Sequence, residues 1–148
     1  MYKKILPPAY LLFALIAMLI IHFTFPITQF IPLPWNLFGL IPLVLGIGFN
    51  LIADSAFHKA GTTVKPFLES NALLTDGVYG ISRHPMYLGF VLVLIGAASL
   101  LGSLTSWVIV PIFIILMEIV FIRIEERMMA QKYELTWLDY KKKVRRWL

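Results

Sequence analysis

Four apolar segments divide this chain of 148 residues, and polar positions gather in the short stretches between them. The segments extend from about Pro8 to Phe25, Leu37 to Phe57, Pro85 to Leu101, and Leu104 to Ile124. Each approaches the ~20 residues that an α-helix needs to cross a ~30 Å hydrocarbon core, although the third is short. The pattern predicts an all-α integral membrane bundle with about four transmembrane helices.

Aromatic and apolar side chains continue beyond the fourth segment at a spacing of three or four residues, which is typical of a helix. They are Met129, Tyr133, Trp137, Tyr140 and Val144. The other face of this stretch is basic. We therefore predict a C-terminal amphipathic interfacial helix from Glu125 to Leu148 that continues the fourth segment, within a single membrane-embedded domain at 1–148.

Composition supports a membrane protein. The chain is 59% hydrophobic and 14% charged, with a mean hydropathy of +0.83, whereas soluble domains carry about 25% charged residues. Because it has no cysteine, disulfides and thiolate chemistry are excluded. Its three histidines lack the spacing of metal ligands, so we expect no protein-held metal. The net charge of +5 is distributed in a way that favours a membrane surface over nucleic acid.

The positions of the charges predict an orientation. All 13 lysines and arginines lie outside two loops, from Pro26 to Asn36 and from Gly102 to Ser103. The positive-inside rule therefore predicts that both termini and the central loop are cytoplasmic.

Two polar clusters mark the cytoplasmic ends of apolar segments. Arg83, His84 and Tyr87 lie at the start of the third segment, and Glu125 and Glu126 follow the end of the fourth. Polar groups that face lipid cost several kcal/mol, so such clusters usually face a pocket or the interface. We expect the two helix ends to build one polar site.

Other polar residues allow two interpretations. Asn50, Asp54 and His58 recur every fourth residue in the second segment, either as a polar stripe that satisfies itself or as one wall of a cavity. Glu118 lies inside the fourth segment. It is either a functional carboxylate or half of a buried pair with a basic residue.

The first cluster resembles a known signature. Gly77 to Gly89 is similar to the Arg-His-Pro-x-Tyr-x-Gly signature of the isoprenylcysteine carboxyl methyltransferase family and its phospholipid N-methyltransferase relatives. The stretch from Glu125-Glu126-Arg127 through Tyr133 to Val144-Arg145 resembles the family's C-terminal Glu-Glu…Tyr…Val-x-Arg pattern. The family often has Phe-Gly where this chain has Tyr133-Glu134. The resemblance covers a core of about 53–146.

The resemblance implies S-adenosylmethionine as the cofactor of a membrane methyltransferase. The cofactor-binding residues that it suggests are Tyr79, Arg83, His84, Pro85, Tyr87, Gly89, Glu125 and Glu126. The ammonium of the cofactor needs a carboxylate, for which we favour Glu126 over Glu125, and its carboxylate needs the donors His84 and Arg83. The tyrosine rings suit the sulfonium.

The acceptor is expected to be a lipophilic small molecule or a prenylated chain that enters from the bilayer. An isoprenylcysteine-type carboxylate is the first candidate, with Arg145 favoured as the catalytic cation that holds it and Arg146 or Arg123 as alternatives. Arg145 reaches the site only if the tail folds back, which no nearby glycine or proline encourages. Phospholipid or other amine N-methylation is the alternative, with Glu118 or Glu125 as the base. Two rival classes are an NADPH-dependent enzyme like the sterol reductases and a non-enzymatic lipid-binding protein.

Overall fold

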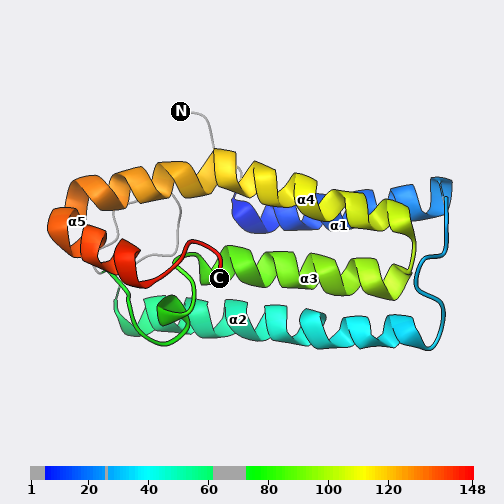
Figure 1. Ribbon diagram of the computed structural model, residues 1–148, viewed down its shortest axis with the longest axis horizontal. Helices are drawn as coiled ribbons and strands as arrows, with labels where there is room; N and C mark the ends of the chain where they lie inside the picture. Colours follow the sequence, from blue (N-terminus) through cyan, green and yellow to red (C-terminus); the bar gives the residue numbers. More distant parts are fainter. Residues whose placement is uncertain (1–5, 26, 62–72) are drawn as a thin grey trace.

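The computed structural model describes residues 6–25, 27–61 and 73–148, and the described part is almost entirely helical (Figure 1). Its elements are α1 (Pro7–Thr24), the 3-10 turn η1 (Trp35–Gly39), α2 (Leu40–Lys59), the 3-10 turn η2 (Gly77–Gly80), α3 (Pro85–Leu101), α4 (Leu104–Met117), the π-helical turn η3 (Glu118–Ile122) and α5 (Arg123–Lys143). Within the described ranges the extended pairing is limited to one isolated bridge, Gln29 with Ser103. The predicted all-α class is confirmed.

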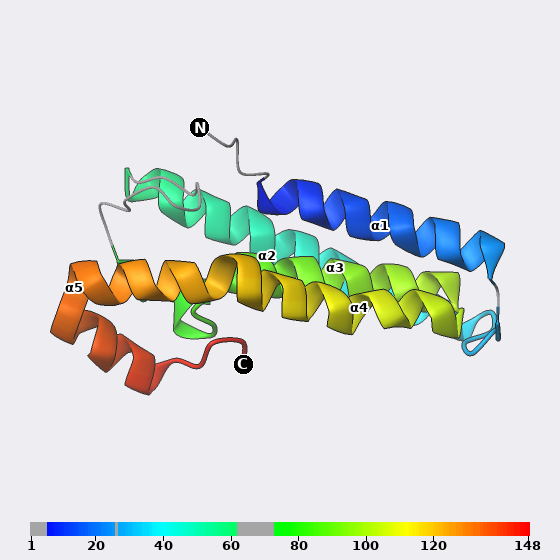
Figure 2. The same cartoon turned by 90° about the horizontal axis from the view of Figure 1, so that it is seen from above.

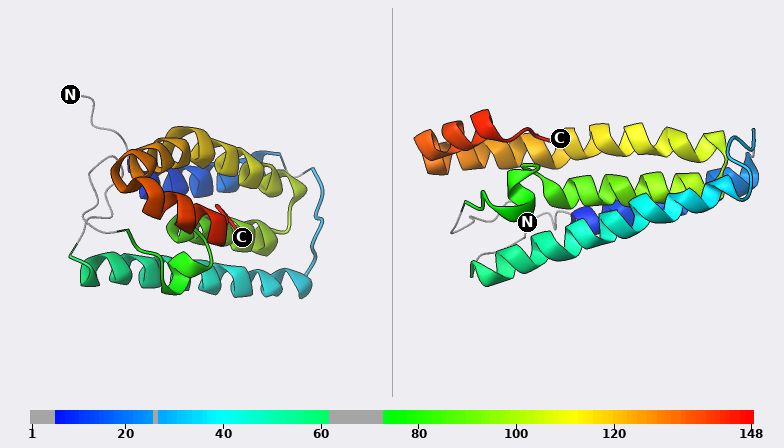
Figure 3. Two further views of the ribbon diagram at one scale, coloured as in Figure 1. Left: turned by 60° about the vertical axis from the view of Figure 1, so that its left-hand side comes forward. Right: turned by 60° about the horizontal axis from the view of Figure 1, so that its bottom comes forward.

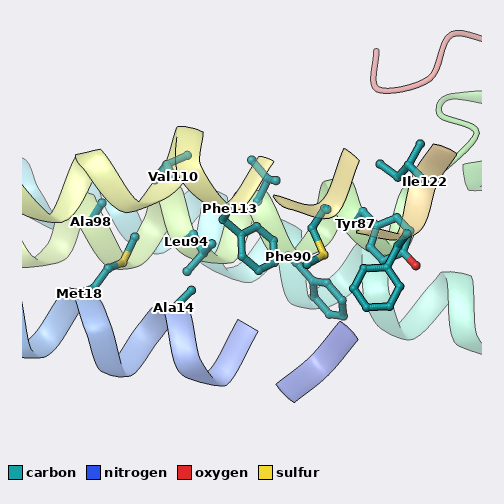
Figure 4. Close-up of a cluster of buried hydrophobic side chains, with 12 residues drawn as sticks. Ala14, Met18, Tyr87, Phe90, Leu94, Ala98, Val110, Phe113 and Ile122 are labelled. Carbon is teal, nitrogen blue, oxygen red and sulfur yellow. The ribbon is translucent and has the colours of Figure 1, made fainter. Parts of the chain in front are cut away.

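α3 is the central helix of the bundle. It packs against α2 on one side and against α1 and α4 on the other (Figures 1 and 2). Nine residues of α3 are buried, against three of α1 and two of α2. The apolar core lies between α1, α3 and α4 (Figure 4). Met18, Leu94 and Met117 are almost completely enclosed there.

Three helical stretches are long and apolar enough to cross a bilayer: Pro7–Thr24, Trp35–Lys59 and the continuous Leu104–Lys143. The fourth apolar helix, α3, has 17 residues, which gives about 26 Å at 1.5 Å per residue. Because its neighbours enclose it, α3 does not need to match the bilayer thickness on its own. The predicted bundle of four apolar helices is therefore confirmed, and the chain is an integral membrane protein.

Glycines form the contact between α2 and α3. A Cβ at Gly46 would lie 2.5 Å from the Gly89 carbonyl oxygen, and one at Gly96 would lie 2.7 Å from the Gly39 carbonyl oxygen. Small residues let two helix backbones approach closely, which is how membrane helices gain packing energy without a hydrophobic driving force. This close approach fixes the start of α3 relative to α2.

The C-terminal helix is present as predicted, but it is bent. Glu134 has φ 40° and ψ −111°, and beyond it the second half of α5 returns beside the first half (Figures 2 and 3). The returning half buries Trp137, Tyr140 and Val144, and Met129 packs against this cluster. The aromatic stripe that suggested a straight amphipathic helix therefore closes a small core of its own.

The glycine contact generates a prediction. Gly46→Ala should lower the free energy of unfolding by about 1–3 kcal/mol, because its methyl group overlaps the α3 backbone. Gly48→Ala is the matched control, since a Cβ there meets nothing within 4 Å. In a helix interior it should be neutral or stabilise by up to about 1 kcal/mol. Thermal unfolding in one detergent measures both variants, and equal effects would contradict the predicted overlap.

Candidate active site

The start of α3 places three polar side chains at one end of the bundle. Pro85 occupies the first turn of α3, where its fixed φ suits a helix start and its missing N–H removes no intrahelical bond. His84 precedes it, and its main-chain N–H donates to Ser82 Oγ at 3.2 Å. Tyr87 follows in the first turn. Arg83, His84 and Tyr87 thus project from a short, fixed segment.

The second wall of the site comes from the junction between α4 and α5. The π-helical turn Glu118–Ile122 lies at this junction. Such turns contain i→i+5 hydrogen bonds, shift the helix face that follows and are frequent at functional sites. After it, Glu125 and Glu126 both reach the residues at the start of α3.

Glu126 is shared by two arginines. Its Oε1 accepts hydrogen bonds from Arg83 Nη2 at 2.8 Å and Nε at 3.1 Å, and from Arg146 Nε at 3.0 Å. Arg146 Nη2 donates to Oε2. Glu126 is 8% exposed, so both oxygens of a buried carboxylate are used by cations of the protein.

Arg83 also holds the end of the chain. Its Nη1 donates to the Val144 carbonyl at 2.6 Å, and its main-chain N–H donates to the Arg145 carbonyl at 3.0 Å. The guanidinium carbon lies 5.8 Å from the ring centroid of Trp137, a cation–π contact. These contacts fold the tail back onto the site.

Glu125 has a different environment. Its Oε1 accepts a hydrogen bond from the Tyr87 hydroxyl at 2.6 Å, and its Oε2 lies 3.6 Å from His84 Nδ1. The side chain of Glu125 is 20% exposed. Of the two adjacent glutamates, it is the more exposed and the one that no arginine contacts in the described part of the chain.

His84 lies between the two carboxylates. Its Nε2 is 3.5 Å from Glu126 Oε1 and is a buried nitrogen with no hydrogen-bond partner among the described residues. Burial opposes the charged form, but the negative charges of Glu125 and Glu126 beside the ring outweigh it and raise the pKa of the imidazole. His84 is therefore held toward its cationic form between two negative charges.

Glu118 is an ion-pair partner. Arg146 Nη1 donates to its Oε1, and Arg123 Nε lies 3.8 Å from the same atom. This arrangement matches the paired alternative that the sequence left open.

The tail brings Arg146, rather than Arg145, to the carboxylates. The side chain of Arg145 is exposed, and its main-chain carbonyl makes the contact with Arg83. Arg146 was an alternative to the favoured Arg145, and the resembled pattern supports it: in a Val-x-Arg pattern that begins at Val144, the arginine is Arg146.

Three other residues that we expected to bind the cofactor lie near the site, where they pack against neighbouring helices or turns. Tyr79 is buried; its hydroxyl lies 3.5 Å from the Ala53 carbonyl, and its own carbonyl accepts a hydrogen bond from Tyr140 at 2.6 Å. Pro85 is buried at the start of α3, and Gly89 faces α2 in the glycine contact. Farther away, Asp54 and His58 form an exposed pair at 3.4 Å.

The fold and the site define an integral membrane helical protein whose polar centre joins the starts of α3 and α5. The chain belongs to the phospholipid methyltransferase family, whose profile matches residues 35–136. It is 37% identical over 111 residues to the protein-S-isoprenylcysteine O-methyltransferase of Saccharomyces cerevisiae, covering 72% of this chain and 45% of the relative. It is 29% identical over 112 residues to protein-S-isoprenylcysteine O-methyltransferase A of Arabidopsis thaliana, covering 72% and 55%.

A solved structure has the same fold. The eukaryotic intramembrane Ras methyltransferase ICMT (isoprenylcysteine carboxyl methyltransferase) superimposes with a TM-score of 0.64 at 23% identity, over 100% of this chain and 53% of that one. The chain thus spans about half the length of the relatives that it matches.

The shared carboxylate generates a prediction. Glu126→Gln should destabilise the protein by about 2–4 kcal/mol, because it leaves Arg83 and Arg146 facing a neutral amide. Thermal unfolding measures this loss, and limited proteolysis should show earlier cleavage in the tail. Asp139→Asn is the control, since the Asp139–Lys142 pair is exposed and should contribute less than about 1 kcal/mol. An intact, protease-resistant tail in Glu126→Gln would contradict the role of Glu126 as its anchor.

Proposed function

We propose that this chain transfers a methyl group from S-adenosylmethionine to a lipophilic acceptor at one face of the membrane. The first candidate for the acceptor is an isoprenylcysteine-type carboxylate. The relatives named above are protein-S-isoprenylcysteine O-methyltransferases, and the proposal extends that activity to a shorter chain.

The proposal rests on the difference between the environments of the two glutamates. Glu126 is neutralised by Arg83 and Arg146, whereas Glu125 is oriented by Tyr87 and His84 and remains 20% exposed. An oriented, partly exposed carboxylate at the mouth of an apolar bundle suits the ammonium of an amino acid group. The residues therefore fit S-adenosylmethionine, and they favour Glu125 rather than Glu126 as its partner.

S-adenosylmethionine, when bound, supplies a methyl group on a positively charged sulfur. In the proposed mechanism Glu125 binds its ammonium, and His84 with its raised pKa holds Glu125 in place and supplies positive charge for the cofactor's carboxylate. The ring of Tyr87 stacks on His84 at 5.8 Å and offers an aromatic face. Arg83 acts indirectly, because its donors are used by Glu126 and the tail.

In this proposal the carboxylate of the acceptor binds next to Arg146. This side chain is 35% exposed and touches Glu118 on the membrane side and Glu126 on the site side. The hydrogen bonds that Arg146 donates to both carboxylates, and their negative charge, raise its pKa, so it stays charged. A carboxylate acceptor is already ionised at neutral pH and needs a cation to hold it rather than a base. We therefore assign to Arg146 the role first expected of Arg145.

We also propose that the site faces the cytoplasm. Among the described residues, the lysines and arginines gather at the end of the bundle that contains Arg83 and Glu126, as the positive-inside rule requires. Both termini would lie on that side.

Cofactor binding is the first test. S-adenosylmethionine or its demethylated product should raise the melting temperature, since a ligand of the native state stabilises it by RT ln(1 + [L]/Kd). Glu125→Gln should weaken binding by about 2–3 kcal/mol, the lower part of the range for truncating a charge-pair partner. Glu134→Gln, an exposed glutamate at the bend, should bind normally. A shift with NADPH alone would indicate the reductase class, and no shift with either cofactor would indicate a lipid-binding protein.

Acceptor chemistry is the second test. With saturating cofactor, Arg146→Gln should slow methylation of a farnesylated cysteine by roughly 10²-fold, because the acceptor carboxylate loses its cation. Cofactor affinity is measured on the same sample, so that damage to the site is recognised. Arg145→Gln is the matched control and should retain turnover. If labelled methyl appears only on phosphatidylethanolamine, the acceptor is an amine and the carboxylate assignment is wrong.

A further inference from the structure

We propose that the outer face of residues 135–145, which are the returning half of α5 and the two residues after it, binds the headgroups of anionic phospholipids at the bilayer surface. This inference goes beyond methyl transfer and does not depend on it. It rests on the bend at Glu134, which turns this segment back and gives it a buried side and an outward side.

The two sides differ sharply in burial. Trp137, Tyr140 and Val144 are 4%, 6% and 8% exposed and form the small core under the bend. Leu135 and Leu138 are 76% and 49% exposed. Two leucines on the outward side of a short helix are typical of a surface that lies in the headgroup region.

The same outward region carries four cations. Lys141, Lys142, Lys143 and Arg145 are all exposed. Of these, Lys142 pairs with Asp139 at 3.3 Å, an exposed contact that contributes little. A group of four basic residues beside a membrane-spanning helix matches the charge of anionic lipids.

The position of the tail favours the bilayer over an acidic protein as the partner. After Lys143 the chain leads to Trp147, which packs against the core shared by α1, α3 and α4. Figure 1 shows the C-terminal end at the start of α3, where the Arg83 N–H donates to the Arg145 carbonyl. The lysines therefore lie close to the membrane boundary, where the exposed leucines also find an apolar medium.

Lipid binding there would act on the candidate active site. Arg146 lies three residues after Lys143, and the Ser82 hydroxyl donates to its carbonyl at 3.0 Å. A headgroup held by the lysines would keep this segment closed over Glu126.

Amide hydrogen exchange of the full chain in nanodiscs tests the proposal. Exchange of residues 135–148 is compared between discs of neutral phosphatidylcholine and discs with about a third of anionic phosphatidylglycerol. Anionic discs should slow exchange in this segment by roughly fivefold for each lysine engaged, and high salt should remove the difference. Lys141→Gln with Lys143→Gln should remove most of the difference, since two of the four cations are lost. The matched control is Lys59→Gln with Arg127→Gln, which removes the same charge from exposed positions elsewhere.

Three outcomes would overturn the proposal. Equal exchange of the wild-type tail in both discs would show that anionic lipid does not bind there. Equal loss of protection in the test and control variants would show a response to net charge alone. Protection by a soluble polyglutamate peptide, without any effect of anionic lipid, would assign the surface to an acidic protein.

Discussion

The carboxylate of Glu126 joins three separate segments of this protein. It receives Arg83 from the start of α3 and Arg146 from the end of the chain, while its own backbone belongs to α5. Taking three charges into a mostly buried position is costly, and the hydrogen bonds among them offset that cost only when all are present. The arrangement of α3, α5 and the tail therefore depends on one side chain, and Glu125 is oriented as a consequence.

The glycine contact has a complementary role in the membrane. α3 is short for a bilayer span, and it carries the motif that builds the site. Because Gly46 and Gly89 let α2 approach closely, α3 is enclosed without long side chains at the contact. Gly89 thus belongs to the signature for a packing reason, and the position of His84 depends on that packing.

Much of the fold was predictable, because the length of an apolar segment and the positions of charged residues indicate directly where a chain crosses a membrane. The four helices and the shared face of the two motifs follow from those patterns. The bend at Glu134 could not be predicted from the sequence, because neither glycine nor proline occurs there. Contacts between residues distant in sequence hold it. The choice of Arg146 over Arg145 depends on that bend. The different environments of Glu125 and Glu126 depend on which arginines contact each carboxylate. Helical periodicity does not predict those contacts.

The bend at Glu134 has a consequence for how the protein opens. A non-glycine residue at φ 40° costs free energy locally, and the resembled family's glycine at this position would avoid that cost. The returning helix has a small core of its own, so it forms a natural unit of sub-global unfolding. When that unit opens, Arg146 leaves with it and Glu126 loses half of its partners. The ligand affinity that an experiment measures is therefore the intrinsic affinity reduced by the fraction of molecules whose tail is closed.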